Sequence, residues 1–365
     1  LNREWQTKLT SFDEITVPDV DNPLGITEVP RKHLWMRFVE QLYADVYHQI
    51  AAAIRAKDPA PGKLIGAEGS MMGDPELTLE GLTMWGPYPS RLDNAMMRSF
   101  GSPELLRGNW WGGYLAQRAA GGQPLWTQVL SGGVNASFYF QDLGGEGVLS
   151  QDLSFTDFFE KEQWPVMLEV NASVGPLLAK LPTANLGLGI LYSRSSEHAL
   201  TIDGRTGSPG STRDGLLAWS EELGIPAFLC SPTQIEAGKL TTDNMRILFM
   251  PQVTCLDEST VQALQRWVEA GGTLVADLQP GFRNGRGAPR TSAVADALFG
   301  VTHQLTSKPA DSAVTLAVDG KNLVLERMLS DSSVQPAGAV AQGKLANGTP
   351  ILFSRTVGKG RTLLL

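Results

Sequence analysis

The 365-residue chain contains little of what several classes of protein depend on. Its two cysteines, Cys230 and Cys255, are too few for a disulfide framework and match no zinc-binding spacing. It has no excess of basic residues, and a net charge of -8 argues against a nucleic-acid surface, which needs a basic patch to neutralise phosphates. No apolar run approaches the roughly 20 residues that a membrane-spanning helix needs. We therefore expect a soluble, acidic protein whose partners are neither nucleic acid nor membrane.

The composition is typical of a globular protein with more than one domain. Hydrophobic residues make up 42% and charged residues 19%, and the length allows two ordinary domains with a large core. The chain opens at Leu1 without an initiator Met and stops at Leu365 inside an apolar run typical of a strand. We therefore expect it to be part of a longer polypeptide. A cytoplasmic location is expected, and secretion stays open because a signal peptide would lie upstream of Leu1.

The first half of the chain alternates predicted strands and helices. Apolar residues recur every four positions from Leu34 to Ile54 and predict a helix over 31–56. Further strands are expected at 63–67, 82–85, 105–111 and 134–140, and further helices at 94–100, 124–131 and 158–181. This alternation implies parallel strands joined by crossover helices. Residues 1–182 are therefore interpreted as the C-terminal part of a (β/α)8 TIM barrel.

A second α/β series begins near residue 183. Four strands and two helices are expected, the strands at 187–192, 227–230, 246–250 and 273–277 and the helices at 213–223 and 258–270. This order is typical of a doubly wound domain of flavodoxin or class I amidotransferase type, which we place at residues 183–306. From residue 313 onward, apolar segments alternate with turn sequences such as Asn347-Gly348. This pattern predicts a small β region over 307–365.

Two glutamates are the candidate catalytic residues of the first half. Glu68 follows a predicted strand and is flanked by small residues that leave its carboxylate accessible. In a β/α barrel the active site is built at the C-terminal strand ends, and glycoside hydrolysis uses a pair of carboxylates. Glu104 directly precedes the strand predicted at 105–111. It qualifies as a nucleophile only if that strand starts earlier than predicted. The structural alternatives are a carboxylate that hydrogen-bonds loop backbone for Glu68 and a solvated loop residue for Glu104.

Aromatic residues gather at or just beyond the predicted strand ends. Sugar rings present C–H faces that stack on aromatic rings, and their hydroxyls need polar partners such as Asn109 or Asp93. The alternative is that several of these rings pack beneath the loops as core. The candidate substrate-binding residues are Trp85, Tyr88, Asn109, Trp110, Trp111, Tyr114 and Phe140.

The second half offers no complete catalytic constellation. A phosphate site would need a Gly-rich loop at the start of a helix, whereas the turn after the first strand of this half reads Ser193-Arg194-Ser195-Ser196. A cysteine nucleophile would need a tight elbow with a histidine and a carboxylate nearby, and neither cysteine has one in the sequence. We therefore expect a packing or oligomerisation role for this domain. The sequence predicts no metal site and no cofactor, and His33 and His48 are interpreted as surface or packing residues.

The order of several motifs resembles glycoside hydrolase family 42. The segment Leu1-Asn2-Arg3-Glu4-Trp5-Gln6-Thr7 is similar to the one that follows the family's fourth barrel strand, and Trp85-Gly86-Pro87-Tyr88-Pro89 is similar to its sixth strand end. Gln123-Pro124-Leu125-Trp126 and the run from Gly132 to Gln141 resemble its seventh helix and eighth strand. Residues 185–300 look like the family's β-galactosidase trimerisation domain, an amidotransferase-like fold without the catalytic residues of amidotransferases. The resemblance covers nearly the whole chain.

The resemblance implies a retaining β-galactosidase that needs no cofactor and assembles as a homotrimer. The family's acid/base glutamate would lie upstream of Leu1. Its nucleophile precedes an Asn-Trp pair, and here Asn109-Trp110 is present while residues 105–108 stand where the glutamate is expected. Glu104 is the nearest carboxylate. This departure leaves two interpretations: Glu68 has taken over as a catalytic carboxylate, or hydrolysis has been lost.

Two functions of different classes therefore remain open. The first is a retaining glycoside hydrolase of β-galactosides or related β-glycosides, with a carbohydrate substrate and a homotrimeric assembly. The alternative is a non-catalytic carbohydrate-binding or scaffolding protein with a degenerate barrel. An amidotransferase-like enzyme in the second half is disfavoured, because that half has no nucleophile elbow.

Overall fold

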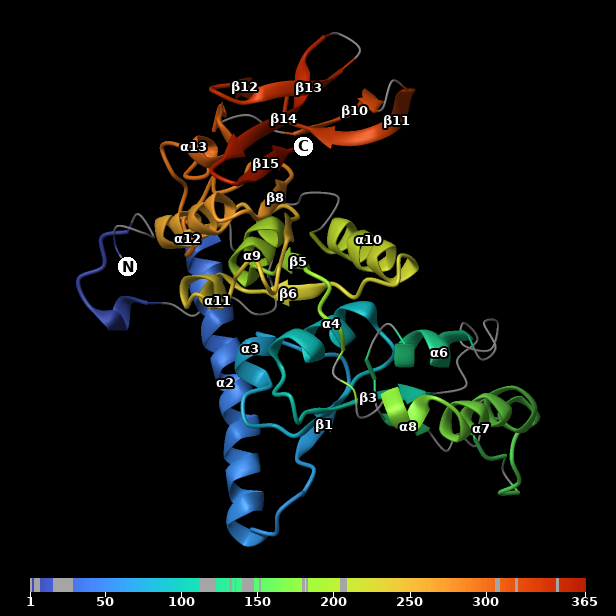
Figure 1. The fold of residues 1–365 in the computed structure, drawn as a ribbon. Coiled ribbons are helices and arrows are strands. Elements are labelled where there is room, and N and C mark those ends of the chain that lie inside the picture. The colour runs from blue at the N-terminus through green and yellow to red at the C-terminus, as the bar shows by residue number, and fades with distance from the viewer. Residues whose placement is uncertain are drawn as a thin grey trace. The chain divides into compact units, whose positions relative to one another are not determined.

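The computed structural model describes residues 2, 7–15, 29–111, 123–130, 133–134, 136–139, 148–150, 152–178, 181, 183–203, 209–305, 309–318, 321–345 and 348–365. The chain divides into two compact units, whose elements are labelled in Figure 1. Unit 1 comprises Leu1–Phe38, Leu186–Gly215 and Leu229–Leu365. Unit 2 comprises Val39–Asn185 and Leu216–Phe228.

Unit 2 is built on a sheet of four strands in the order β1-β2-β3-β4. The strands are β1 (Gly66–Glu68), β2 (Met84–Gly86), β3 (Leu106–Trp111) and β4 (Ala136–Tyr139). All three pairs of neighbours are parallel, with Ala67 opposite Trp85 and Trp85 opposite Arg107. Helices connect consecutive strands, so the sheet has the βα connectivity of part of a β/α barrel. The predicted parallel strands are confirmed.

Capping residues set the starts of the helices in unit 2. The Asp74 carboxylate accepts the N–H of Glu76 at the start of α3. The Ser90 hydroxyl accepts the N–H of Asp93 at 3.2 Å, so α4 begins three residues before the predicted Asn94. The helices around the sheet are α2 (Val29–Lys57), α3 (Pro75–Thr78), α4 (Arg91–Phe100) and α6 (Gln123–Leu130), and a 3-10 turn, η1 (Phe12–Glu14), lies in unit 1.

The single helix predicted over 158–181 is wrong. The segment forms a π-helical stretch η3 (Phe159–Gln163), the helix α7 (Trp164–Ala172) and the short helix α8 (Gly175–Leu178). The helix α7 ends at Ser173, whose φ of -109° and ψ of -115° are not helical. Apolar periodicity runs through this break, because it does not register backbone torsions.

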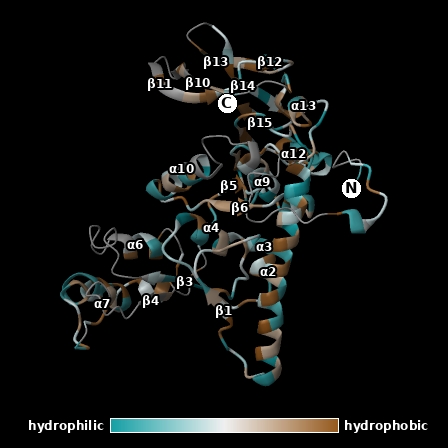
Figure 2. Cartoon of the chain, turned by 180° about the vertical axis from the view of Figure 1, so that it is seen from behind, coloured by the Kyte–Doolittle hydropathy of each residue, from teal (hydrophilic) through white to brown (hydrophobic). Residues whose placement is uncertain are grey.

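The helix α2 exposes an apolar stripe in the part that belongs to unit 2, and Figure 2 shows hydrophobic residues along its length. The opposite face contains the buried Ala44 and Ala51. Large contiguous apolar patches on a protein surface mark places that another polypeptide covers or that promote aggregation. The side chains of the stripe are between 39% and 54% exposed and belong to Val39, Leu42, Val46, Ile50 and Ile54.

Replacing Leu42, Val46 and Ile50 together by Gln is expected to reduce self-association of the 365-residue chain without lowering its free energy of unfolding. Exposed side chains contribute little to the core, whereas their removal shrinks the apolar patch. Sedimentation velocity at matched concentrations measures the association, and urea unfolding measures the stability. Ala51→Gln is the control, because it places a polar side chain on the buried face. A triple variant as unstable as Ala51→Gln would show that the stripe is packed.

Unit 1 contains a nine-stranded sheet in the order β11-β10-β13-β14-β15-β8-β7-β5-β6. The strands of this sheet that come first in the sequence are β5 (Leu188–Leu191), β6 (Phe228–Cys230), β7 (Ile247–Met250) and β8 (Thr273–Ala276). β7 pairs in parallel with both β5 and β8. The spatial order β6-β5-β7-β8 is the doubly wound order that the sequence predicts. The accompanying helices are α9 (Arg194–Asp203), α11 (Pro232–Glu236), α12 (Glu258–Glu269) and α13 (Asp296–Phe299), whereas α10 (Pro209–Glu222) is divided between the two units after Gly215.

The small β region predicted over 307–365 consists of strands as expected, and these strands continue the same nine-stranded sheet. The strands β10 (Ala310–Val318), β11 (Lys321–Ser330), β13 (Val340–Leu345) and β14 (Pro350–Val357) are antiparallel. β15 (Gly360–Leu364) connects them to β8 by parallel pairing. Alternation along the sequence identifies strands but not the sheet that they join. β9 (Val301–Thr302) and β12 (Gln335–Pro336) form an additional antiparallel pair.

Candidate functional site

The candidate site of unit 2 lies at the C-terminal ends of its parallel strands. Glu68 is the last residue of β1 and is exposed, and Gly86 ends β2 directly opposite it. The N–H of Gly69 donates to the carbonyl of Gly86 at 3.0 Å, which fixes the turn that follows Glu68. The Glu68 carboxylate therefore stands at the edge of the sheet where the loops of a β/α fold build a site.

Trp85 supports this turn from inside the unit. Its side chain is fully buried, at 0% exposure, and its indole N–H donates to the carbonyl of Gly69 at 3.0 Å. Its ring meets Tyr47 edge to face with centroids 5.4 Å apart, and burial raises the pKa of Tyr47 to about 12. Trp85 therefore offers no ring face to solvent, and the core alternative describes its position. It fixes the backbone next to Glu68.

Asp93 holds the same loop from the other side. Its side chain is buried, and its carboxylate accepts the N–H of Met71 at 3.1 Å. The sequence predicts Asp93 as a partner for sugar hydroxyls, whereas the structure uses it to position the chain three residues after Glu68. The helix-start spacing of Ser90 and Asp93 predicts the cap of α4 but not this contact with Met71.

Asn109 belongs to a buried row of side-chain amides. It is 0% exposed, and its Nδ2 donates to Oδ1 of Asn94 at 3.1 Å. The Nδ2 of Asn94 donates in turn to Oε1 of Gln128, so the row links β3, α4 and α6. The Oδ1 of Asn109 is buried and has no hydrogen-bond partner among the described residues. Sequence reasoning identified Asn109 but missed Asn94 and Gln128, which lie on helices and have no motif of their own.

The other aromatic candidates have different positions. Tyr88 lies two residues beyond β2 and is 40% exposed, so it is available at the same edge as Glu68. Trp110 lies in β3 and is half-buried, and its backbone N–H donates to the carbonyl of Pro87 at 2.8 Å. Trp111 ends β3, and its side chain lies outside the described part of the structure. Tyr114 and Phe140 lie outside the described residues.

Glu104 lies at the opposite edge of the sheet from Glu68. It is exposed in the turn before β3, which begins at Leu106, one residue later than predicted. The strand register places Glu68 level with Gly86 and with Gly108, which is four residues beyond Glu104. This offset is about 13 Å along the strand, whereas the carboxyl groups of a retaining pair are about 5 Å apart. Glu104 therefore does not meet the condition set for a nucleophile. The β3 sequence itself, Leu-Arg-Gly-Asn-Trp-Trp, contains no carboxylate.

The two cysteines of unit 1 are buried among backbone. Cys255 is 1% exposed, and its thiol donates to the carbonyl of Ser195 at 3.5 Å. Cys230 is 4% exposed, and its thiol lies 3.9 Å from the carbonyl of Ser231. Reactive cysteines are partly exposed and sit in electropositive surroundings, so both thiols have the environment of structural cysteines.

Asp277 lies directly after β8, and its burial predicts an unusual pH dependence of the free energy of unfolding. Burial raises its pKa to about 6, although the N–H of Gln252 donates to its carboxylate. The unfolded pKa is about 4, so ionisation opposes folding, and the free energy of unfolding is expected to fall between pH 4 and 6 by up to about 3 kcal/mol. Asp277→Asn keeps an acceptor for Gln252 and should be more stable than the wild type at pH 8.

Urea unfolding at pH 4.5 and pH 8 measures this difference between Asp277→Asn and the wild type. Asp214→Asn is the control, because its side chain is 59% exposed. Equal pH dependence in the wild type and in Asp277→Asn would contradict the prediction.

Within the ranges that the structure describes, no group of three or more His, Cys, Asp and Glu side chains is placed to hold a metal ion. No helix in the same ranges is both long and apolar enough to cross a membrane.

Both units are similar to parts of known proteins. Residues 190–365 match the family model of the β-galactosidase trimerisation domain. A β-galactosidase from Bacillus circulans sp. alkalophilus matches 100% of this chain with a TM-score of 0.76 at 14% identity, and 60% of that protein is covered. A β-galactosidase from the haloarchaeon Halorubrum lacusprofundi matches 100% with a TM-score of 0.67 at 16% identity, again covering 60%. No curated protein matches the chain by sequence.

A mannosidase has a similar fold. An exo-β-1,4-mannosidase from Opitutaceae bacterium strain TAV5 matches 96% of this chain with a TM-score of 0.60 at 14% identity, and 74% of that protein is covered. The chain spans about 60% of the length of the β-galactosidases that it matches. Residues 190–365 thus match the β-galactosidase trimerisation domain, and the fold of the chain as a whole is similar to the corresponding part of family 42 β-galactosidases.

Proposed function

We propose that this chain belongs to a retaining glycoside hydrolase of β-galactosides or related β-glycosides, and that Glu68 is one of its two catalytic carboxylates. The observation that carries the proposal is the position of Glu68. It is exposed at the C-terminal edge of a parallel βα sheet, in a chain with the fold of family 42 β-galactosidases. This is the edge at which β/α barrels carry out their chemistry.

In the proposed reaction, Glu68 attacks the anomeric carbon and forms a glycosyl-enzyme intermediate. A second carboxyl group about 5 Å away protonates the leaving oxygen and then activates water. We assign that second group to the part of the barrel that precedes this chain in the matching β-galactosidases. Gly86, opposite Glu68, presents no side chain, and Tyr88 offers a ring at the same edge. Trp85 and Asp93 act as positioning residues, because they hold the turn after Glu68.

We also propose that residues 190–365 mediate assembly into a homotrimer. The support is the match to the trimerisation domain. Size-exclusion chromatography with light scattering is expected to give three times the mass of the polypeptide. A monomer at micromolar concentration would contradict the assembly while leaving the chemistry of Glu68 untested.

The test of the hydrolase uses the intact protein as its source produces it, with its mass measured first. Turnover of aryl β-galactosides, β-mannosides and β-glucosides is followed by release of the chromophore. We expect turnover of at least one of them, and NMR of the first sugar released should show retention of configuration at the anomeric carbon. Inversion would reject the retaining mechanism.

The alternative is a carbohydrate-binding or scaffolding protein with a degenerate barrel. It is favoured by β3, which contains no carboxylate, and by the burial of Trp85 and Asn109 at 0% exposure. Titration calorimetry on the same protein separates the two functions. Sugar affinity without turnover of any substrate in the panel would support the binding protein, and measurable turnover would reject it.

A further inference from the structure

The doubly wound sheet of unit 1 has a crevice where its strand order reverses. From β5 the chain passes to β6 on one side, and then to β7 and β8 on the other. In open α/β sheets, ligands bind outside the carboxyl ends of the strands at this switch point. A small hollow that is open to solvent lies there. Its walls are Leu191, Tyr192, Ser193, Ser196, Glu197, Arg213, Pro251 and Val253.

A buried arginine dominates the polar wall of this hollow. The side chain of Arg213 is 9% exposed, and its guanidinium lies over the ring of Tyr192 at 5.5 Å from the centroid. Its Nη1 pairs with Oε1 of Glu197, whose Oε2 pairs with Nη1 of Arg194. Glu197 therefore bridges two arginines, of which Arg213 lies in the wall of the hollow. The stacking and the ion pair fix the plane of the guanidinium.

One donor of this arginine is unsatisfied. The Nε of Arg213 is buried and has no hydrogen-bond partner among the described residues. The Oδ1 of Asp214 lies 3.6 Å from it, which is too far for a hydrogen bond, and that side chain is 59% exposed. A buried N–H without an acceptor is costly, so an acceptor oxygen from a ligand would be favoured at this position.

The helix α9 adds a second favourable element to the same wall. Two residues separate its start from the end of β5. The hydroxyl of Ser193, which precedes the helix, lies 2.9 Å from that of Ser196 in its first turn. Helix N-termini favour negative charge. The Oγ of Ser196 also accepts the N–H of Cys255 at 3.0 Å, so the turn after β7 and the start of α9 are tied together. The wall is therefore fixed from both sides of the crevice.

We propose that this crevice binds a small oxyanion, the carboxylate or phosphate group of a metabolite, with Arg213 as its principal contact. The enclosed part of the hollow has room for one water-sized group, which matches a single oxygen atom. The rest of the anion lies in the open mouth. This proposal uses no residue of the β1–β4 sheet. Its test is therefore independent of the proposed glycoside hydrolysis.

Titration calorimetry at constant ionic strength tests the proposal, with inorganic phosphate and acetate as probes and chloride as the reference. We expect phosphate and acetate to bind in the millimolar range and chloride and neutral acetamide not to bind. Arg213→Lys should weaken phosphate binding at least fivefold, because an ammonium cannot reproduce the fixed planar guanidinium. Arg266→Lys is the matched control, since Arg266 is exposed on α12.

Glu197→Gln provides a second variant if Arg213→Lys does not fold. It removes the carboxylate that competes for Arg213 but keeps an oxygen to accept its hydrogen bond. We expect it to raise the affinity for phosphate several-fold. Equal binding of acetate and acetamide, or phosphate affinity unchanged in the folded variants, would overturn the proposal.

Discussion

Replacing Glu68 by Gln in the intact protein is expected to lower kcat for an aryl β-galactoside by roughly 10³-fold or more, because the neutral amide cannot form the glycosyl-enzyme bond. KM is expected to change much less. The amide has nearly the shape of the carboxylate, and Glu68 is exposed at the end of β1, so the fold should be retained. Circular dichroism and urea unfolding check that point.

Glu104→Gln is the matched control for this experiment. Glu104 is also exposed and also adjoins a strand of the same sheet, but it lies at the opposite edge. Its kcat should equal that of the wild type. If Glu68→Gln keeps full activity, Glu68 has no part in the mechanism.

Azide rescue separates a nucleophile from an acid/base residue. In Glu68→Ala, azide can attack the anomeric carbon directly from the side that the carboxylate has left. For a β-galactoside, a lost nucleophile gives the α-galactosyl azide, whereas a lost acid/base residue gives the β-anomer. We expect the α-anomer. The β-anomer would keep Glu68 in the site but exchange its role with that of the second carboxyl group.

Trp85→Ala is expected to lower the free energy of unfolding of unit 2 by about 3 to 5 kcal/mol, the range for truncation of a large buried aromatic side chain. The ring is fully buried, and its N–H is hydrogen-bonded to the carbonyl of Gly69. Trp85→Phe should cost less, because it keeps most of the ring and loses one hydrogen bond worth about 1 kcal/mol. Urea unfolding followed by far-UV circular dichroism measures both.

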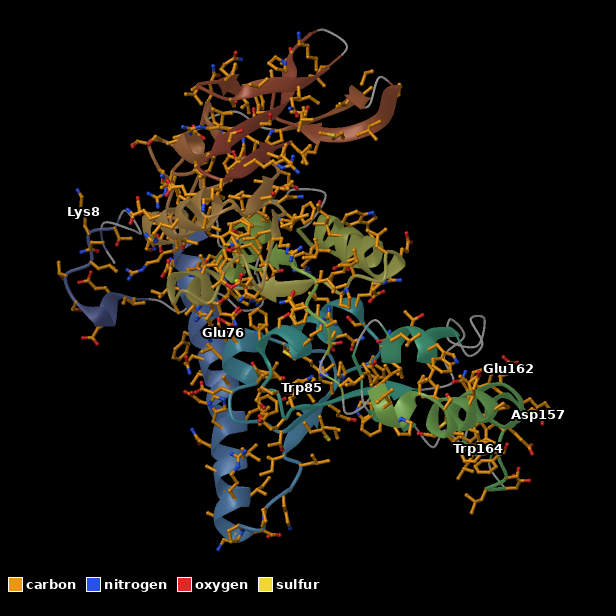
Figure 3. The ribbon with its side chains drawn as sticks, in the orientation of Figure 1. Lys8, Glu76, Trp85, Asp157, Glu162 and Trp164 are labelled. Carbon is orange, nitrogen blue, oxygen red and sulfur yellow. The ribbon has the colours of Figure 1, made fainter. Side chains whose placement is uncertain are left out.

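Trp164→Ala is the control for the effect of removing an indole. Figure 3 labels both side chains, and Trp164 lies at the start of α7 with 41% of its surface exposed. A much smaller loss of stability is expected there. If Trp85→Ala unfolds no more easily than Trp164→Ala, the ring of Trp85 is not part of the core.

Trp85→Phe also reports on the site itself. The lost hydrogen bond anchors Gly69, which has a φ of +94° and directly follows Glu68. A lower kcat with little change in stability is therefore expected from Trp85→Phe. A sugar-stacking role would instead raise KM.

The elements with strong periodicity could be predicted from the sequence. Apolar residues at every fourth position gave a helix over 31–56, and the structure has α2 at Val29–Lys57. The strand predicted at 105–111 is β3 at Leu106–Trp111. α9 was missed because the sequence Arg-Ser-Ser-Glu-His at its start is typical of a loop, and its helical form depends on the hydroxyl of Ser193 accepting the N–H of Ser196.

Only part of the candidate site could be predicted, because the sequence shows local signals but not contacts between distant residues. Glu68 was found because a strand end followed by glycine is a local signal. The roles of Trp85 and Asp93 depend on contacts with Gly69 and Met71 across 16 and 22 residues of sequence, which no local pattern encodes. The start of β3 at Leu106 was needed to show that Glu104 lies at the N-terminal ends of the strands, opposite to Glu68.

The pairing of β15 with β8 determines when the nine-stranded sheet can be completed during synthesis. β15 lies between β14 and β8 in the middle of the nine-stranded sheet, although it is formed by residues 360–364. During synthesis, β8 emerges from the ribosome about 90 residues before its neighbour, so the nascent chain holds an unpaired sheet edge throughout that interval. A chain released early would leave the antiparallel strands without their connection to β8. Translation beyond residue 364 is therefore a condition for closing the centre of this sheet.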